Sequence, residues 1–414
     1  MPEVKPTEVE STASIKVIGV GGAGGSAVNR MREAGLSGVE FVAMNTDAQA
    51  LHNSKADIKV HLGHDTTNGL GAGADPTVGE RAADESREEI KNALTGADMA
   101  FITLGAGGGT GSGAGYIVAE EARKQDILTV GVVTKPFSFE GQKRKANADW
   151  GIERLARNVD ALITIPNDRL LQTIDQRTPI LEAFKIADDV LRQGVQGISE
   201  LITEHGLVNL DFADVRTIMK DAGSALMGIG RASGENRATI AAQQAIESPL
   251  IEVSIDGARG VLLSVIGGYD LSMAEINEAA ELVTSSISPD ANIIWGAAIR
   301  PELEDEVIVT VVATGFDSQY YGDDPRAQQS DLYGGGLNTT IAPEPVAAPT
   351  QIAADPVQNM PEEPVAQQMQ PETPASAVFT DSTNVNMWDQ IRSDSDDDDS
   401  DIPAILRRRK KNKD

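Results

Sequence analysis

The chain has no cysteine, few aromatic residues and a marked shortage of positive charge. The lack of cysteine excludes disulfides, thiol catalysis and zinc–thiolate sites, and it suits a reducing cytosol. Aromatic residues make up 4% of the 414 residues, so we expect a core of Val, Ile, Leu and Ala. The 63 acidic and 35 basic residues give a formal net charge of −28, which makes direct nucleic-acid binding by the body of the protein unfavourable.

Long hydrophobic runs are also missing. No stretch approaches the ~20 apolar residues that a membrane-spanning helix needs. Residues 1–13 are mostly polar and acidic, and they lack the apolar core of a signal peptide. We therefore expect 1–13 to be a flexible N-terminal segment and the protein to be cytoplasmic.

Glycine, in contrast, is abundant, and six glycines fall within residues 105–113. A strand-like stretch at 99–103 precedes this run, and a helical pattern at 114–124 follows it. A strand, a glycine turn and a helix N-terminus together form an anion site, because backbone N–H groups can approach phosphate oxygens and the helix dipole attracts them. The run contains no lysine and is not a Walker A motif. We expect backbone amides and the hydroxyl of Thr110 or Ser112 to hold phosphate there.

A second glycine loop follows a strand-like stretch at 15–18 and precedes a helical pattern at 27–34. Gly19, Gly21 and Gly24 satisfy G-x-G-x-x-G, which also fits a dinucleotide-dependent oxidoreductase. Such an enzyme needs an acidic residue after its second strand, and Asp47 could serve, so this alternative stays open. Two glycine loops are better explained by one nucleotide with several phosphates.

The first half of the chain alternates strands and helices. We predict strands at 15–19, 39–45, 99–104, 128–134 and 161–166. This alternation predicts a Rossmann-like α/β domain with a parallel sheet, in which ligands bind outside the carboxyl ends of the strands.

A long helix and a second domain are expected next. Thr178 and Pro179 suit an N-cap and a first helical position. The helix would run about 24 residues, or ~36 Å, and connect two domains. Strands at 261–266, 292–299 and 307–314, with a helix at 272–287, predict a smaller α/β domain.

The composition changes after residue 317. Residues 318–400 hold nine prolines, 15 acidic residues, two arginines and no lysine, which predicts a disordered acidic linker. Residues 401–414 combine an apolar cluster with five consecutive cations at 407–411. This combination suggests a peptide that docks on partners, and the five cations could also touch an anionic membrane surface. The alternative is an inert solubilising tail.

Asn209, Asp211 and Asp214 lie at the start of a predicted helix. Asp211 and Asp214 are three residues apart, so a helix presents both on one face, where they could polarise a water for attack on phosphate. The alternative is that the two acids only cap their helix.

Several motifs together resemble the tubulin/FtsZ family of GTPases, in its bacterial-type FtsZ branch. The family signature G-G-G-T-G-[ST]-G matches 107–113, and further matches lie at 134–141, 209–219 and 401–404. The resemblance spans roughly residues 14–317 and the last 14. It implies a GTP-binding domain at 14–177, a connecting helix at 178–206, a C-terminal activating domain with the catalytic loop at 207–317, a linker at 318–400 and a partner-binding peptide at 401–414.

The resemblance also implies an activity. The protein would polymerise head to tail into filaments of a division ring at midcell and hydrolyse GTP to GDP and phosphate. The catalytic residues Asn209, Asp211 and Asp214 would act on the nucleotide of the neighbouring subunit. Mg2+ would be bound mainly through phosphates and water, with no direct ligand from protein side chains.

Individual residues take roles from the same resemblance. The phosphates would be held by Gly22, Ala23, Gly24, Gly25, Ser26, Gly108, Gly109, Thr110 and Gly111. Further nucleotide contacts are implied for Ala72, Gly73, Ala74, Glu140, Arg144, Asn167, Phe184 and Asp188. Of these, Phe184 would stack on the base and Asp188 would accept the guanine N1–H and 2-amino protons. Helical periodicity alone favours other roles, with Phe184 in the core of the long helix and Asp188 on a solvated face. Membrane-tethering and regulatory division proteins would bind Asp401, Ile402, Pro403, Ile405, Leu406 and Arg407.

Three residues depart from the family pattern. Ser26 stands where Asn is common, Tyr116 where Pro is frequent, and Ile405 where Phe is usual. Two other kinds of function remain open: the oxidoreductase, and a nucleotide-binding scaffold that does not hydrolyse its ligand.

Overall fold

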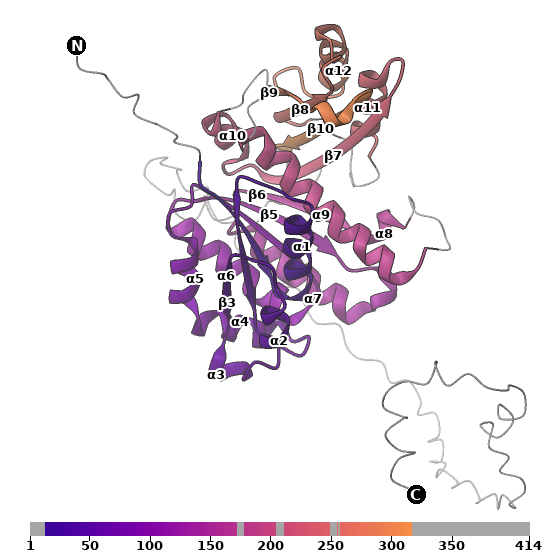
Figure 1. The fold of residues 1–414 in the computed structure, drawn as a ribbon. Helices are drawn as coiled ribbons and strands as arrows, with labels where there is room; N and C mark the ends of the chain where they lie inside the picture. The colour runs from indigo at the N-terminus through magenta and orange to yellow at the C-terminus, as the bar shows by residue number, and fades with distance from the viewer. Residues whose placement is uncertain (1–12, 172–177, 204–210, 249–254, 256, 317–414) are drawn as a thin grey trace, which may run out of the picture. The chain divides into compact units, whose positions relative to one another are not determined.

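The computed structural model describes residues 13–171, 178–203, 211–248, 255 and 257–316. Their strands form a ten-stranded sheet in the order β3-β2-β1-β4-β5-β6-β7-β10-β8-β9 (Figure 1). The expectations for residues 1–12, Asn209, the linker and the C-terminal peptide fall outside the described residues.

The strands are β1 (Ile15–Val20), β2 (Val39–Asn45), β3 (Ile58–His61), β4 (Met99–Gly105), β5 (Leu128–Lys135), β6 (Ala161–Pro166), β7 (Gly223–Ser233), β8 (Gly260–Gly267), β9 (Asn292–Ile299) and β10 (Glu306–Thr314). The α-helices are α1 (Gly21–Glu33), α2 (Ala48–His52), α3 (His64–Thr67), α4 (Pro76–Glu85), α5 (Arg87–Leu94), α6 (Gly109–Lys124), α7 (Gln142–Ala156), α8 (Asn167–Leu170), α9 (Ile180–Thr203), α10 (Phe212–Met219), α11 (Arg237–Ile246) and α12 (Met273–Ser285). Two short 3-10 helices are η1 (Ser138–Glu140) and η2 (Pro301–Leu303).

The first six strands are parallel, as the alternating pattern predicts. Their apolar runs are buried on both faces, which is the usual state of a parallel sheet covered by helices. In β1, Ile15 and Val17 join the core under α1 and α9, while Ile18 and Val20 join the core under α4, α5 and α6. The five predicted strands are confirmed to within one residue at either end; β3 was missed because it is only four residues long.

The second half continues the same sheet. Strand β7 pairs in parallel with β6 through Ala161↔Gly223, Leu162↔Ser224 and Ile163↔Ala225. Strand β10 is antiparallel to both β7 and β8, and β9 is parallel to β8. The three predicted strands are confirmed, but β7 was missed because Gly223, Gly228 and Gly230 interrupt its apolar pattern. The expected second α/β region is therefore present, on a sheet that it shares with the first.

Helix α9 has the predicted length of 24 residues. It begins at Ile180, two residues after the expected cap Thr178. Helices α1 and α6 begin inside the glycine runs, at Gly21 and Gly109, and not after them at 27 and 114 as the pattern predicted. This correction matters for the site, because it places glycines at the open ends of two helices.

Candidate functional site

Both glycine loops lie where the strand order of the sheet changes direction. From β1 the chain passes to β2 and β3 on one side, and from β4 to β5 and β6 on the other. Strands β1 and β4 are neighbours, and each is followed by a glycine turn and a helix, α1 or α6. The carboxyl ends of strands at such a switch point form the usual ligand crevice of an open α/β sheet.

The two glycine turns touch each other. Gly21 has φ +74°, and a Cβ atom built on it would lie 2.9 Å from the backbone nitrogen of Gly111. Gly107 has φ +100°, and its N–H donates to the Ser112 hydroxyl at 2.9 Å. Only glycine combines these positive φ angles with such close backbone approach. Ser112 is thus turned inward to brace the loop and, contrary to expectation, does not line the cavity described next.

A cavity of about 260 Å³ lies beside these turns. The structure brings many of the predicted nucleotide-binding residues together around it: Gly22, Ala23, Gly108, Gly109, Thr110, Gly111, Glu140, Arg144, Asn167, Phe184 and Asp188. They come from α1, α6, α7, α8, α9 and the connection after β5, so segments far apart in sequence meet at one place.

One end of the cavity is suited to phosphate. The first N–H groups of α1 and α6 have no acceptor within their own helices, and helix N-termini attract anions. A Cβ atom on Gly22 or Gly108 would meet nothing within 4 Å, so both glycines leave room for a ligand against the backbone. The Thr110 hydroxyl shares a hydrogen bond of 2.6 Å with the Thr46 hydroxyl, which holds it at the rim.

The other end is suited to a nucleoside. Asn167 is 6% exposed, and its buried Oδ1 has no hydrogen-bond partner. Such an orphaned acceptor is costly unless a ligand satisfies it. Phe184 is 40% exposed and lies edge-on to Phe137 at 5.5 Å, so it is not the core residue that helical periodicity alone would suggest.

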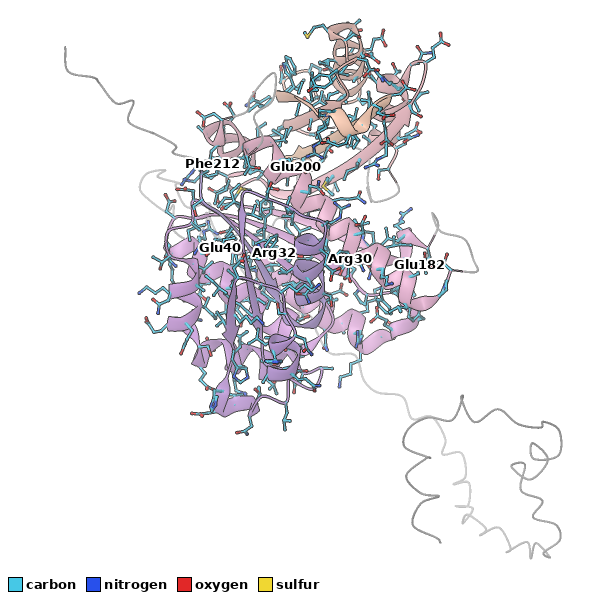
Figure 2. All side chains as sticks on the ribbon, in the orientation of Figure 1. Arg30, Arg32, Glu40, Glu182, Glu200 and Phe212 are labelled. Carbon is cyan, nitrogen blue, oxygen red and sulfur yellow. The ribbon has the colours of Figure 1, made fainter. Side chains whose placement is uncertain are left out.

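Asp188 lies one helical turn beyond Phe184 on α9. Burial raises the pKa of its carboxyl to about 6, although Arg30 of α1, labelled in Figure 2, partly lowers it again. A half-buried carboxylate is therefore available to hydrogen-bond donors at neutral pH, and Asp188 is not on a solvated face.

Glu140 and Arg144 form an ion pair at the edge of the cavity. Glu140 also accepts a hydrogen bond from the backbone N–H of Phe137 at 3.0 Å. The side chain of Glu140 is 11% exposed and that of Arg144 is 51% exposed, so the arginine is the partner that is more accessible from solvent.

Six predicted residues do not line this cavity: Gly24, Gly25, Ser26, Ala72, Gly73 and Ala74. Gly24 packs closely against the Thr103 carbonyl, which indicates helix–sheet packing. Gly25 and Ser26 line a neighbouring hollow between α1 and β2. Ala72 packs against Gly109 and supports the α6 end of the cavity. Gly73 and Ala74 have φ near +60° and are exposed beside it.

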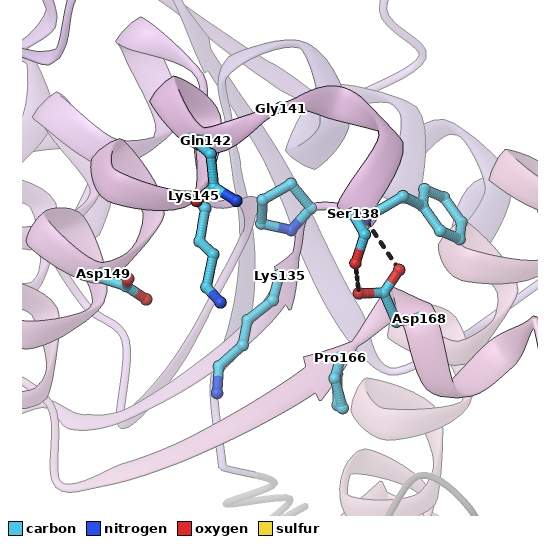
Figure 3. Close-up of a pocket in the computed structure, with 10 residues that line it drawn as sticks. Lys135, Ser138, Gly141, Gln142, Lys145, Asp149, Pro166 and Asp168 are labelled. Carbon is cyan, nitrogen blue, oxygen red and sulfur yellow. Dashed lines mark hydrogen bonds between the residues drawn. The ribbon is translucent and has the colours of Figure 1, made fainter.

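Some lining residues were not assigned a role by the sequence: Val20, Gly105, Ala106, Thr134, Pro136 and Ala187. Pro136 had a detectable signal, because it follows a predicted strand at the same sheet edge. It also lines a second cavity of about 270 Å³. There the Ser138 N–H donates to Asp168, and the side chains of Lys135 and Lys145 line the same cavity (Figure 3).

Asp211 and Asp214 cap the helix α10. The Ala213 N–H donates to Asp211 Oδ1 at 3.4 Å, and the Asp211 N–H donates to Asp214 Oδ2 at 3.3 Å. Neither residue lines the cavity. The capping role is therefore present, and any action on a nucleotide must come in addition to it.

Among the described residues, no group of three or more His, Asp or Glu side chains is arranged to hold a metal ion. None of the described helices combines the length and apolar character required to span a membrane.

Family models match two parts of the chain. The Tubulin/FtsZ family GTPase domain matches residues 14–175, and the FtsZ family C-terminal domain matches residues 223–317.

Solved structures give a consistent result. An FtsZ mutant from M. jannaschii is 48% identical, with a TM-score of 0.71 over 74% of this chain and 92% of its own. An empty FtsZ dimer from M. jannaschii is 44% identical, with a TM-score of 0.72 over 81% of this chain and 96% of its own. CetZ2 from Haloferax volcanii, a GTPgS-bound protofilament, has 20% identity and a TM-score of 0.63 over 78% of this chain and 100% of its own, a likeness of fold alone.

Proposed function

We propose a function for this chain on the premise that it belongs to the tubulin/FtsZ family and, within it, to the FtsZ type. Membership makes the chain a cytoskeletal GTPase that binds GTP and GDP. It polymerises head to tail into filaments of a division ring, in the cytoplasm at midcell, and the subunit interface completes the hydrolytic site.

The observation that carries this proposal is the separation of the cavity from the two acids. The cavity lies at the N-terminal end of α6, at Gly109 to Gly111. Helix α10 contacts the other end, where Arg216 Nη2 lies 2.9 Å from Asp126 Oδ2. A helix of 16 residues is about 24 Å long, so Asp211 and Asp214 cannot reach a nucleotide in the cavity of their own chain. A head-to-tail contact between copies brings one chain's cavity to the next chain's acids, and it repeats into an open filament.

The cavity residues bind and orient GTP. Backbone amides at Gly22, Ala23 and the start of α6 hold the phosphates, together with the Thr110 hydroxyl. The neighbouring loop at 72–74 senses the terminal phosphate. Mg2+, bound through phosphates and water, neutralises phosphate charge when present.

The nucleoside end selects guanine. Phe184 stacks on the base, and Asp188 accepts the guanine N1–H and 2-amino protons, a pair of donors that adenine lacks. Asn167 and Glu140 contact the ribose, and Arg144 neutralises nearby charge.

Asp211 and Asp214 of the neighbouring subunit orient or activate the attacking water, and Asn209 supports them. Capping uses one oxygen of each carboxylate, and each carboxylate has a second oxygen that can accept a hydrogen bond from water. The hydrogen bonds that cap the helix also fix the direction of both side chains.

The division of labour along the chain follows the same proposal. Residues 14–177 bind GTP, and residues 207–317 supply the catalytic loop. Residues 178–206 connect these two regions. The linker at 318–400 tethers a peptide at 401–414 that binds membrane-tethering and regulatory division proteins, with weak contact between its basic end and the membrane surface.

The first test is GTP hydrolysis per molecule against protein concentration, with magnesium present. A shared site predicts a threshold concentration, followed by turnover that rises to a plateau. Constant specific activity at high dilution would place the whole site in one chain and remove the roles of Asp211 and Asp214.

A mixing experiment tests the same point by an independent route. Asp214→Asn keeps a side-chain acceptor for the cap but removes the charge, so the variant should bind GTP without turning it over. At a GTP concentration just sufficient to saturate the parent protein, Gly22→Ala should keep Asp214 but leave most of its cavities without GTP. Mixed together, the two inactive variants should recover part of the turnover, because one cavity can meet the other chain's acids; no recovery in co-assembled filaments would contradict the proposal.

The alternatives identified from the sequence are less well supported. Asp47, the acid that an oxidoreductase would use on ribose, accepts the N–H groups of Gln49 and Ala50 and caps α2. If the protein is instead a scaffold that does not hydrolyse GTP, the parent protein should show no turnover above background. Asp214→Asn should then give the same background rate.

A further inference from the structure

We propose that Asp126 and Arg216 are positioning residues for GTP hydrolysis, because they fix the helix that carries Asp211 and Asp214 against the far end of α6. This inference rests on the proposed function. We refer to Arg123, Asp126, Arg216 and Asp221 together as the α6–α10 clamp.

The clamp contacts α10 at its C-terminal end and just beyond it. Arg216 Nη2 donates to Asp126 Oδ2 at 2.9 Å, and Lys220 Nζ lies 3.9 Å from the other oxygen of that carboxylate. Just beyond the helix, Asp221 Oδ1 accepts a hydrogen bond from Arg123 Nη2 at 3.3 Å. Arg123 is itself held by the carbonyl of Arg157 at 3.0 Å. The charged contacts therefore come from one short stretch, the C-terminal end of α6 and the residues that follow it.

Asp126 has a left-handed backbone conformation, which only a few residue types adopt readily. Its φ is +55°, and its N–H donates to the Arg123 carbonyl at 3.0 Å just after the last turn of α6. Glycine is the usual residue at such a left-handed position, and a side chain there has a conformational cost. Aspartate has some conformational cost at this position, and its exposed carboxylate contacts Arg216 of α10 and Lys220 just beyond the helix. Arg216 Nη2 also donates to the Asp126 carbonyl at 3.5 Å, a contact that does not require a carboxylate. We attribute the presence of aspartate, in place of glycine, to those contacts.

The other contacts of α10 leave its direction less well defined. Val215, Ile218 and Met219 are buried against the sheet, and the Thr314 hydroxyl donates to the Ile218 carbonyl at 3.2 Å. Apolar packing tolerates small rotations of a short helix, and the Thr314 hydroxyl fixes a single carbonyl. The charge-assisted hydrogen bond from Arg216 to Asp126 adds a second directional contact, closer to Asp214. Arg216 lies two residues after Asp214, so the clamp acts within one turn of that proposed catalytic acid.

Helix α6 also connects the cavity of a chain to the acids that the same chain would present to its neighbour. The N-terminal end of α6 lines the cavity, and its C-terminal end holds α10. A filament contact that adjusts the cavity of one chain is thereby linked to the direction in which that chain presents its own acids.

The test uses the full chain and three variants. Asp126→Gly removes the carboxylate and the strain together, so the fold should be retained with an unchanged or higher Tm. Asp126→Asn removes the charge but keeps a residue that tolerates this backbone. Glu33→Gln is the matched control, because Glu33 pairs with Lys55 at 2.7 Å on an exposed surface away from α10.

Hydrolysis rate is measured against protein concentration, so that the slope above the threshold gives turnover per assembled subunit. We expect both Asp126 variants to lower this slope by about two- to fivefold, the rate equivalent of an exposed ion pair. GTP affinity and the Glu33→Gln slope should stay at the parent values. Raising the salt concentration should reduce the difference between the parent protein and Asp126→Gly, because salt screens the ion pair.

If Asp126 only stabilises the fold, the result should differ. Turnover per assembled subunit should then fall only in variants whose Tm also falls. The positioning role of the clamp is overturned if Asp126→Gly keeps the turnover per assembled subunit of the parent protein. It is also overturned if the loss of turnover in Asp126→Gly comes with a matching loss of Tm. If the parent protein itself shows no threshold, or Asp214→Asn keeps full turnover, the proposed function has failed and the clamp fails with it.

Discussion

The backbone nitrogen of Gly111 lies 2.9 Å from the point that a Cβ atom on Gly21 would occupy. The two residues are 90 positions apart in the sequence, and their contact brings the N-terminal ends of α1 and α6 together at one end of the cavity. Neighbouring Gly22 differs from Gly21 in having open space before it. Substitutions at Gly21 and Gly22 can therefore distinguish effects on the stability of the fold from effects on nucleotide binding.

Gly21→Ala should damage the fold, because alanine at φ +74° is strained and its methyl group meets Gly111. We expect a loss of about 2 kcal/mol or more in the free energy of unfolding. Gly22→Ala should leave stability unchanged or slightly raised but weaken GTP binding at least about tenfold, because the methyl group fills the phosphate space. Urea unfolding and calorimetric titration with GDP check the two variants; equal affinity in Gly22→Ala would remove the phosphate assignment.

Phe184→Ala should weaken guanine nucleotide binding with little effect on stability. The ring is 40% exposed in the ligand-free protein, and stacking on a base contributes about 1–3 kcal/mol, so we expect a loss of about tenfold or more in affinity. Leu181→Ala is the control, since Leu181 lies on the same helix, is 66% exposed and does not line the cavity. Similar effects in the two variants would indicate a general disturbance of α9.

Guanine nucleotide affinity should fall below about pH 6. Burial raises the pKa of Asp188 to about 6 from 3.8, and a protonated carboxyl cannot accept both guanine donors. We expect GDP affinity to be constant above that value and to fall by up to about tenfold per pH unit below it. Calorimetric titration between pH 5 and pH 8 checks this, with Asp188→Asn as the variant that should lack the step.

The same raised pKa has an opposite effect on stability. Between pH 3.8 and pH 6 the ligand-free native state holds a proton on Asp188 that the unfolded chain has released. The contribution of Asp188 to stability is therefore present at low pH and lost as pH rises through about 6. Ligand-free Asp188→Asn should show a flatter stability profile over this range.

Arg237→Leu should destabilise the β8–β10 half of the protein. The Arg237 side chain is 5% exposed and donates to Asp270 at 2.6 Å, Glu275 at 2.8 Å and Asp305 at 3.1 Å. Removing it leaves three carboxylates without their shared cation, at a cost of about 1–2 kcal/mol at pH 7, because Asp270 and Asp305 are more than half exposed to screening water. Arg231→Leu is the control, because Arg231 is 60% exposed and meets Glu306 at 3.5 Å.

The effect of Arg237 should depend on pH in a defined direction. Its hydrogen bonds lower the pKa of Glu275 to about 2 from 4.5. Stability from a lowered pKa is present above the unfolded value and is lost as pH falls toward the folded one. The difference between the parent protein and Arg237→Leu in urea unfolding should therefore shrink between pH 4.5 and pH 3.

The phosphate end of the site could be predicted from the sequence, because a strand, glycines and a helix are contiguous in the chain. The nucleoside end could be located only by resemblance. Phe184 and Asp188 fit the apolar and polar positions of an ordinary helix, and nothing local reveals that both line a cavity. The orphaned Asn167 oxygen is a property of burial, which follows from tertiary packing.

The missed strands have physical explanations of the same kind. Strand β3 is too short for a period to emerge, and three glycines interrupt the apolar pattern of β7. One of them is required by packing, because a Cβ atom on Gly230 would collide with the Ala241 carbonyl of α11. The use of Asp126 was also hidden, because its partner Arg216 is 90 residues away in sequence.

The position of the cavity and of the acids at opposite ends of α6 sets a rule for counting working sites. Every chain would bring one cavity and one pair of acids, but a site needs a cavity and acids from different chains. An open filament of n subunits would then contain n − 1 complete sites. A pair of chains would turn over GTP at half the rate per chain of a very long filament, and a chain at one end would hold a nucleotide that it has no means to hydrolyse. Average length would thus be readable from turnover alone, and the two ends of a filament would differ chemically even if every chain in it were identical.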